Sequence, residues 1–144
     1  MTSALPGDRF RRHITNNVEN AMQDSKRIRG IGEVLRRLPP ELRQWHRFRN
    51  VVRLEYRQSL GGRSDIRMVL TDEGWEWFLA LTLTDTQGDV HFHTHSGFFS
   101  GFTIEDHTED GWEGRCFLVT SFEPDCDIRI SCGAVAAELV EGEL

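Results

Sequence analysis

The sequence lacks any long apolar run. Its 144 residues contain no stretch of about eighteen uncharged apolar residues, which is the length that a membrane-spanning helix needs. The N-terminal residues also lack the apolar core of a signal peptide, because Arg9, Arg11 and Arg12 follow directly after Asp8. These absences predict a cytoplasmic protein with no membrane partner.

Cysteine is scarce, and its spacing fits no known framework. Cys116, Cys126 and Cys132 are odd in number, and separations of ten and six residues suit neither a disulfide scaffold nor paired zinc-binding motifs. None of the three stands next to a histidine or at a recognisable helix start, so a nucleophilic role has no support. We expect reduced, buried thiols.

Familiar catalytic and cofactor motifs are also missing. The sequence has no Gly-x-Ser-x-Gly, and Gly30-Ile31-Gly32 lacks the third glycine of a dinucleotide-binding loop. Carboxylates are plentiful, but none stands in an apolar context that would obviously raise its pKa. We therefore predict a protein that is not an enzyme and has no cofactor.

Charge is distributed unevenly along the chain. Residues 1–50 carry 11 Lys and Arg against 5 Asp and Glu, whereas residues 51–144 carry 6 against 18. The length suits a single domain, 1–144, made of a basic helical segment, 1–50, and an acidic β-meander, 51–144. The acidic majority would repel a polyanion, so we expect no nucleic-acid partner. The basic segment either packs on the acidic sheet or serves as a docking face.

The basic segment has helical periodicity. Apolar residues recur every fourth position at Phe10, Ile14, Val18 and Met22, which predicts a helix from about Asp8 to Arg29. After Gly30, the apolar residues Val34, Leu35 and Leu38 predict a short second helix that Pro39-Pro40 must end.

From Val51 onward, apolar and polar residues alternate, which is typical of strands with one buried face. Turn residues at 61–62, 72–74 and 87–89 separate the runs. We expect an α+β fold, with N-terminal helices packed on a curved antiparallel meander sheet of six or seven strands. The expected runs lie at 51–57, 66–70, 75–83, 90–95, 98–104, 115–122 and 127–132, the last with a possible continuation to 139.

Three histidines share one face of an expected strand. His91, His93 and His95 are two residues apart, and His107 with Glu105 lies one hairpin away. Three imidazoles on one face could bind zinc, copper or iron. The alternative needs no metal, because Val90 and Phe92 on the other face would leave the histidines as the polar side of a half-buried strand. A metal-binding β-fold enzyme is therefore one alternative function.

An acidic segment separates two of the expected strands. Residues 105–113 carry five carboxylates and one tryptophan. Carboxylates steer a basic partner toward a surface, and an aromatic side chain supplies contact area that loses water on binding. The alternative is an exposed hairpin loop whose tryptophan folds back on the core. The candidate partner-binding residues are Glu105, Asp106, Glu109, Asp110, Trp112 and Glu113.

The expected meander of the second half carries an Ile-Glu-Asp strand end, a strand closing on Glu and a strand with a late Cys, in residues 101–106, 112–123, 128–132 and 137–140. In these residues the chain resembles small bacterial immunity proteins of contact-dependent toxin systems. The resemblance implies a non-catalytic cytoplasmic antitoxin that binds and blocks a cognate toxin domain, often a nuclease. A third possibility is a subunit of a larger assembly that docks through the basic N-terminal helix.

Overall fold

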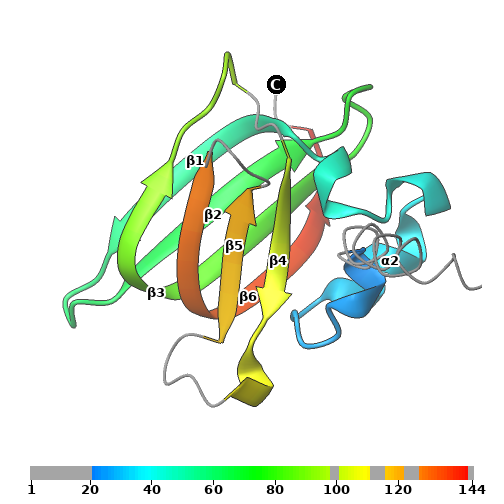
Figure 1. Ribbon diagram of the computed structural model, residues 1–144. Helices are drawn as coiled ribbons and strands as arrows, with labels where there is room; N and C mark the ends of the chain where they lie inside the picture. The colour runs from blue at the N-terminus through cyan, green and yellow to red at the C-terminus, as the bar shows by residue number, and fades with distance from the viewer. Residues whose placement is uncertain (1–20, 98–100, 111–115, 122–126, 143–144) are drawn as a thin grey trace, which may run out of the picture.

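The computed structural model describes residues 21–97, 101–110, 116–121 and 127–142, which form a mostly β, broadly α+β fold (Figure 1). One α-helix, α2 (Ile31–Arg37), lies among short 3-10 turns, η1 (Met22–Asp24), η2 (Pro40–Leu42), η3 (Trp45–Arg47) and η4 (Thr108–Asp110). The strands are β1 (Asn50–Gln58), β2 (Ser64–Thr71), β3 (Phe78–Phe92), β4 (Phe102–Asp106), β5 (Phe117–Ser121) and β6 (Ile128–Val140). Among the described residues, no helix is long and apolar enough to cross a membrane.

All six strands belong to one open antiparallel sheet in the order β1-β2-β3-β6-β5-β4. The sheet thus consists of two three-stranded units, β1–β3 and β4–β6, joined by the pairing of β3 with β6. These are the two longest strands, with 15 and 13 residues. The sheet curves strongly, so that β4 and β5 stand across the interior from the first three strands (Figure 1).

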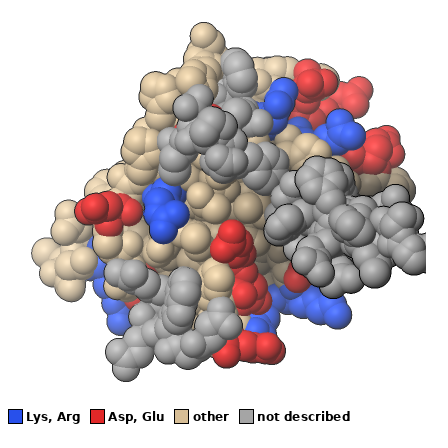
Figure 2. All heavy atoms as spheres, viewed as in Figure 1, with Lys and Arg blue, Asp and Glu red and all other residues tan. Residues whose placement is uncertain are grey.

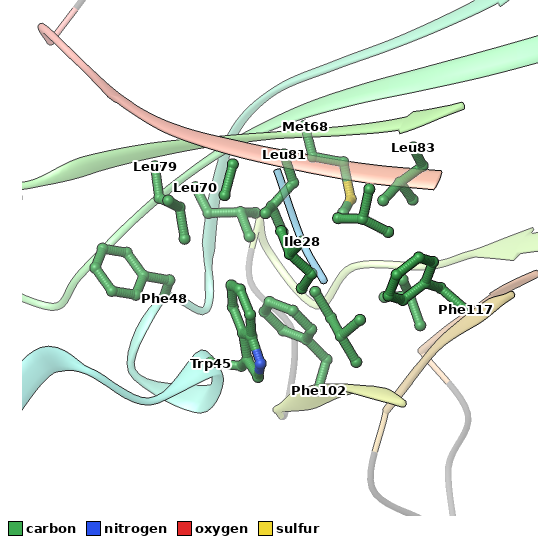
Figure 3. Packing of buried hydrophobic residues seen from close by; sticks show 14 of the residues in the cluster. Ile28, Trp45, Phe48, Met68, Leu70, Leu79, Leu81, Leu83, Phe102 and Phe117 are labelled. Atoms are coloured by element: carbon green, nitrogen blue, oxygen red, sulfur yellow. The ribbon is translucent and has the colours of Figure 1, made fainter. Parts of the chain in front are cut away.

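The core fills the concave side of this curved sheet. Leucines of β2 and β3, among them Leu70, Leu79 and Leu81, project toward Trp45 and Phe102 (Figure 3). The Trp45 and Phe102 rings lie 6.2 Å apart between centroids, which ties η3 to β4. A large buried aromatic pair of this kind contributes both area and ring contact. The N-terminal segment therefore closes the open side of the sheet.

The described end of the expected first helix is not helical. Residues 8–20 lie outside the described residues, and beyond them only Met22–Asp24 make a 3-10 turn. Arg29 instead pairs with β6, where its N–H donates to Val135 O at 3.0 Å and its carbonyl accepts from Ala137 N–H at 2.8 Å. The pairing of β5 with β6 does not extend to this part of β6. Arg29 therefore makes the backbone hydrogen bonds that β5 leaves unmade there. This tertiary pairing overrides the local helical pattern.

The second expected helix is confirmed as α2, which ends just before Pro39 as the two prolines require. The strand expectations differ in three places. The strand order is not that of a meander, because β6 and not β4 lies next to β3. Most of the runs 75–83 and 90–95 belongs to one strand, β3, because residues 88–90 form an irregularity in its pairing with β6 rather than a turn. β3 also begins only at Phe78, since Asp72 holds the preceding residues in a loop.

Candidate functional site

The acidic segment begins where β4 ends. The Asp106 carboxylate accepts hydrogen bonds from the Thr108 N–H at 2.9 Å and the Thr108 hydroxyl at 2.7 Å. These bonds close the chain into η4, because a short carboxylate can substitute for a backbone acceptor in a turn. We call Glu105–Asp110 the acidic turn. Figure 2 shows acidic side chains gathered at this end of the molecule, with basic side chains beside them.

Arg27 holds the acidic turn from the other end of the sequence. Its guanidinium donates to Glu109 Oε2 at 2.6 Å and to the Thr108 hydroxyl, and it lies 3.8 Å from an Asp106 carboxylate oxygen. The hydrogen bond to Glu109 is the main cause that raises the pKa of Arg27 above its ordinary value. One guanidinium fork thus fixes two carboxylates and a hydroxyl in a single arrangement.

A second contact fixes the start of the turn. His107 Nε2 lies 2.9 Å from Glu105 Oε1, and the His107 N–H donates to Cys116 O at 2.6 Å. The backbone of the turn is therefore tied to the residue that precedes β5. Each of the two carboxylates at the start of the turn is thus held by its own partners, Glu105 by His107 and Asp106 by Thr108 and Arg27.

The structure brings together two of the six candidate partner-binding residues, Asp106 and Glu109, at Arg27, whereas Glu105 pairs with His107. Asp110 ends η4, while Trp112 and Glu113 lie outside the described residues. The segment 105–110 contains four acidic residues, of which Asp106 and Glu109 lie within ion-pair distance of Arg27, so its formal charge stays negative. Glu109 remains largely exposed in spite of its ion pair.

His93 and His95, which follow the end of β3 instead of continuing the expected strand, make a separate cluster near the start of β4. His95 Nε2 lies 3.0 Å from Asp127 Oδ1, and the His93 N–H donates to Asp127 O at 2.6 Å. The His93 and His95 rings meet edge to face, 4.8 Å between centroids. The Asp127 carboxylate is buried, and its backbone N–H donates to the Ser121 hydroxyl at 2.7 Å. The buried Asp127 therefore contacts the His95 ring through its carboxylate and the His93 backbone through its carbonyl.

The proposed ligand set of His91, His93, His95 and His107 is not assembled. Within the described ranges, no group of three or more His, Cys, Asp or Glu side chains is placed to hold a metal ion. The register explains the separation: β4 begins opposite Ser121, beside Asp127, and ends opposite Phe117 near His107. This five-residue strand puts roughly 14 Å between its two ends, at about 3.4 Å per residue.

Sequence reasoning missed two residues of these clusters. Arg27 stands 82 residues before Glu109, and Asp127 stands 32 residues after His95. In the sequence, Arg27 is one cation among many in the basic segment, and Asp127 is one of several carboxylates, placed just before a strand. No local pattern reports a partner at such a separation.

Comparison with known proteins gives no relative: no protein-family model, no curated protein and no solved structure matches the chain.

Proposed function

We propose that this chain is a non-catalytic protein-binding inhibitor, of the kind that neutralises a cognate bacterial toxin domain, and that it docks its partner through the acidic turn. The observation that carries this proposal is the array of carboxylates that Arg27 and His107 hold in place. A preset surface loses little conformational entropy on binding, so more of the contact energy remains as affinity.

The charge of the turn suggests the chemistry of the partner. Four carboxylates in six residues favour a basic surface, and the substrate groove of a nuclease is basic because it binds phosphates. Glu109 is exposed enough to exchange Arg27 for a cation of the partner. Trp112 and Glu113, which follow in sequence, complete the proposed contact surface.

The test of the function is rescue from toxicity. The reading frame immediately upstream of this gene is expressed in a naive host, with and without this protein. We expect toxicity alone, survival on co-expression, and a purified complex of the two proteins. A harmless neighbour, or toxicity that persists, overturns the inhibitor function itself.

The test of the docking site uses charge reversal. The variant Glu109→Lys/Asp110→Lys/Glu113→Lys keeps the contacts of Asp106 with Thr108 and of Glu105 with His107, and it removes the Glu109–Arg27 ion pair. The control, Glu41→Lys/Glu73→Lys/Glu141→Lys, changes the net charge equally at exposed carboxylates elsewhere. We expect the turn variant to bind about 100-fold more weakly than the control, mainly through slower association at low salt. Equal affinities would place the contact elsewhere.

A further inference from the structure

Strand β1 ends the strand order of the sheet. Among the residues that the structure describes, it pairs as a strand with β2 on one side only. The hydrogen bond from Val51 N–H to Gly97 O, 2.7 Å, touches its beginning. An open edge of this length presents a row of backbone donors and acceptors to any second strand.

The inward face of this edge is apolar and uncovered. Leu54 lies opposite Met68, and Tyr56 lies opposite Ile66, in the pairing of β1 with β2. Met68 and Ile66 are 0% and 2% exposed, whereas Leu54 and Tyr56 are 40% and 57% exposed. The apolar inner face of the sheet therefore extends as far as β1, where its last side chains are exposed to solvent. Edge strands that are protected from association carry charged residues on such inward positions.

The outward face of the same strand carries a symmetrical charge pattern. Arg53, Glu55 and Arg57 alternate with the apolar positions, and all three are exposed. Arg53 Nε lies 3.7 Å from a Glu55 carboxylate oxygen. Because this cation–anion–cation row reads the same in both directions, an antiparallel copy that is displaced by two residues sets Glu55 opposite an arginine.

We propose that this edge is a self-association site, at which β1 of two copies pair antiparallel about a two-fold axis perpendicular to the sheet. Paired residues in antiparallel strands face the same side, so charged positions meet charged positions and apolar meet apolar. With Tyr56 opposite Tyr56 of the second copy, each Glu55 faces an Arg57. With Leu54 opposite Leu54 of the second copy, each Glu55 faces an Arg53.

Both of these registers form two interchain ion pairs and cover the open apolar strip. Leu54 and Tyr56 of one copy lie directly or diagonally opposite the same residues of the other, within reach of large side chains. The register with Glu55 opposite Glu55 is excluded by like charges on all three rows. The product is one continuous sheet made of two six-stranded halves, with a closed two-fold interface.

The test is the mass of the full-length protein in solution as a function of concentration. A contact of one strand per copy is smaller than a standard stable interface, so we expect a shift from the 16.6 kDa monomer toward twice that mass at roughly 10–100 µM. A chain that stays monomeric in sedimentation equilibrium at about 0.5 mM, well above that range, overturns the proposal.

Charge-swapped variants then locate the contact. Glu55→Arg makes a row of three arginines, and Arg53→Glu/Arg57→Glu makes a row of three glutamates, so each variant alone should associate at least tenfold more weakly. An equimolar mixture should recover the dimer, because every row then pairs opposite charges. Each variant also places a like charge opposite Arg67 or Asp65 of β2, so thermal melts check that each remains folded.

The matched control is Glu141→Arg, an exposed reversal away from β1 that should leave association unchanged. If both row variants dimerise as the parent does, or if mixing restores nothing, the contact is not at β1 and the assignment fails. None of these measurements needs the proposed toxin partner, so the self-association and inhibitor proposals stand or fall separately.

Discussion

Gly30 is the residue at which the chain turns from the Arg29 bridge into α2. Its φ of +84° is one that side chains disfavour, and a Cβ there would overlap the carbonyl oxygen of Ala137. We expect Gly30→Ala to lower the free energy of unfolding by about 3 kcal/mol, since it combines backbone strain with displacement of the bridge. Urea denaturation measures this change.

Gly32 provides the matched control two residues away. It lies inside α2, and an added Cβ would meet nothing within 4 Å. Gly32→Ala should therefore stabilise the protein by about 0.5–1 kcal/mol through helix propensity. If the two alanine variants shifted the urea midpoint in the same direction, the close approach of Gly30 to β6 would not be the cause of the change in stability.

Cys132 is a second residue whose behaviour follows from its surroundings. Burial is the main cause that raises the pKa of its thiol to about 12. At pH 8, only about one molecule in ten thousand then carries the reactive thiolate. In a Cys126→Ser variant, we expect a thiol reagent to modify the half-buried Cys116 first and to reach Cys132 only on unfolding. Rapid modification of both would contradict the buried position.

The same raised pKa sets a pH dependence of stability. The folded state holds the Cys132 proton more tightly than the unfolded state, whose thiol has a pKa near 9. The stabilisation from the neutral thiol is complete below pH 9 and is lost as the pH rises from 9 toward 12. Cys132→Ala should therefore lose less stability than the parent between pH 8 and pH 10.

At the scale of elements, the loop between β2 and β3 depends on one carboxylate. Asp72 accepts the backbone N–H groups of Trp77 at 2.8 Å, Glu76 at 3.0 Å and Gly74 at 3.2 Å. We expect Asp72→Ala to cost about 2–3 kcal/mol, because these donors lose their acceptor together. Chemical denaturation measures the loss of stability, and faster hydrogen exchange at residues 74–77 shows that the loss arises in this loop.

The neighbouring Glu73 is the control for this loop. It is exposed, and its closest ion-pair partner is Arg49 at 3.9 Å, so Glu73→Ala should change stability by less than about 0.5 kcal/mol. A comparable loss in both variants would mean that the loop does not depend on the Asp72 carboxylate.

The same elements show how far the sequence predicts the fold. Alternation located parts of all six strands, and paired prolines located the end of α2, because both signals are local. Alternation could not distinguish a turn at 87–89 from a bulge inside β3. Both use glycine and acidic residues in unusual conformations, as Gly88 with φ +72° shows.

Only part of the candidate site could be predicted from the sequence. The acidic turn could be predicted, since its carboxylates are contiguous in sequence. Its positioning cation could not be predicted, because Arg27 meets Glu109 only when the N-terminal segment folds across the end of the sheet.

At the scale of the whole molecule, the ion pairs between the basic and acidic segments are local among the residues that the structure describes. Between described residues before and after position 50, the ion pairs join Arg27 to Asp106 and Glu109, and Arg49 to Glu73. All are at least partly exposed, so each contributes little to stability. Within the described part of the chain, the contacts between the two charged segments are therefore surface contacts and not a buried electrostatic core.

The central place of β6 has a consequence for synthesis. β1–β3 and β4–β5 emerge from the ribosome first, yet β6 is the strand that joins them and that also pairs with Arg29. Until β6 emerges, β3 and β5 each expose an unpaired edge, which is the kind of surface that drives aggregation of nascent chains. Pairings at such long sequence separation also form slowly. The nascent chain should therefore need a chaperone or rapid translation through residues 128–140 more than its small size suggests.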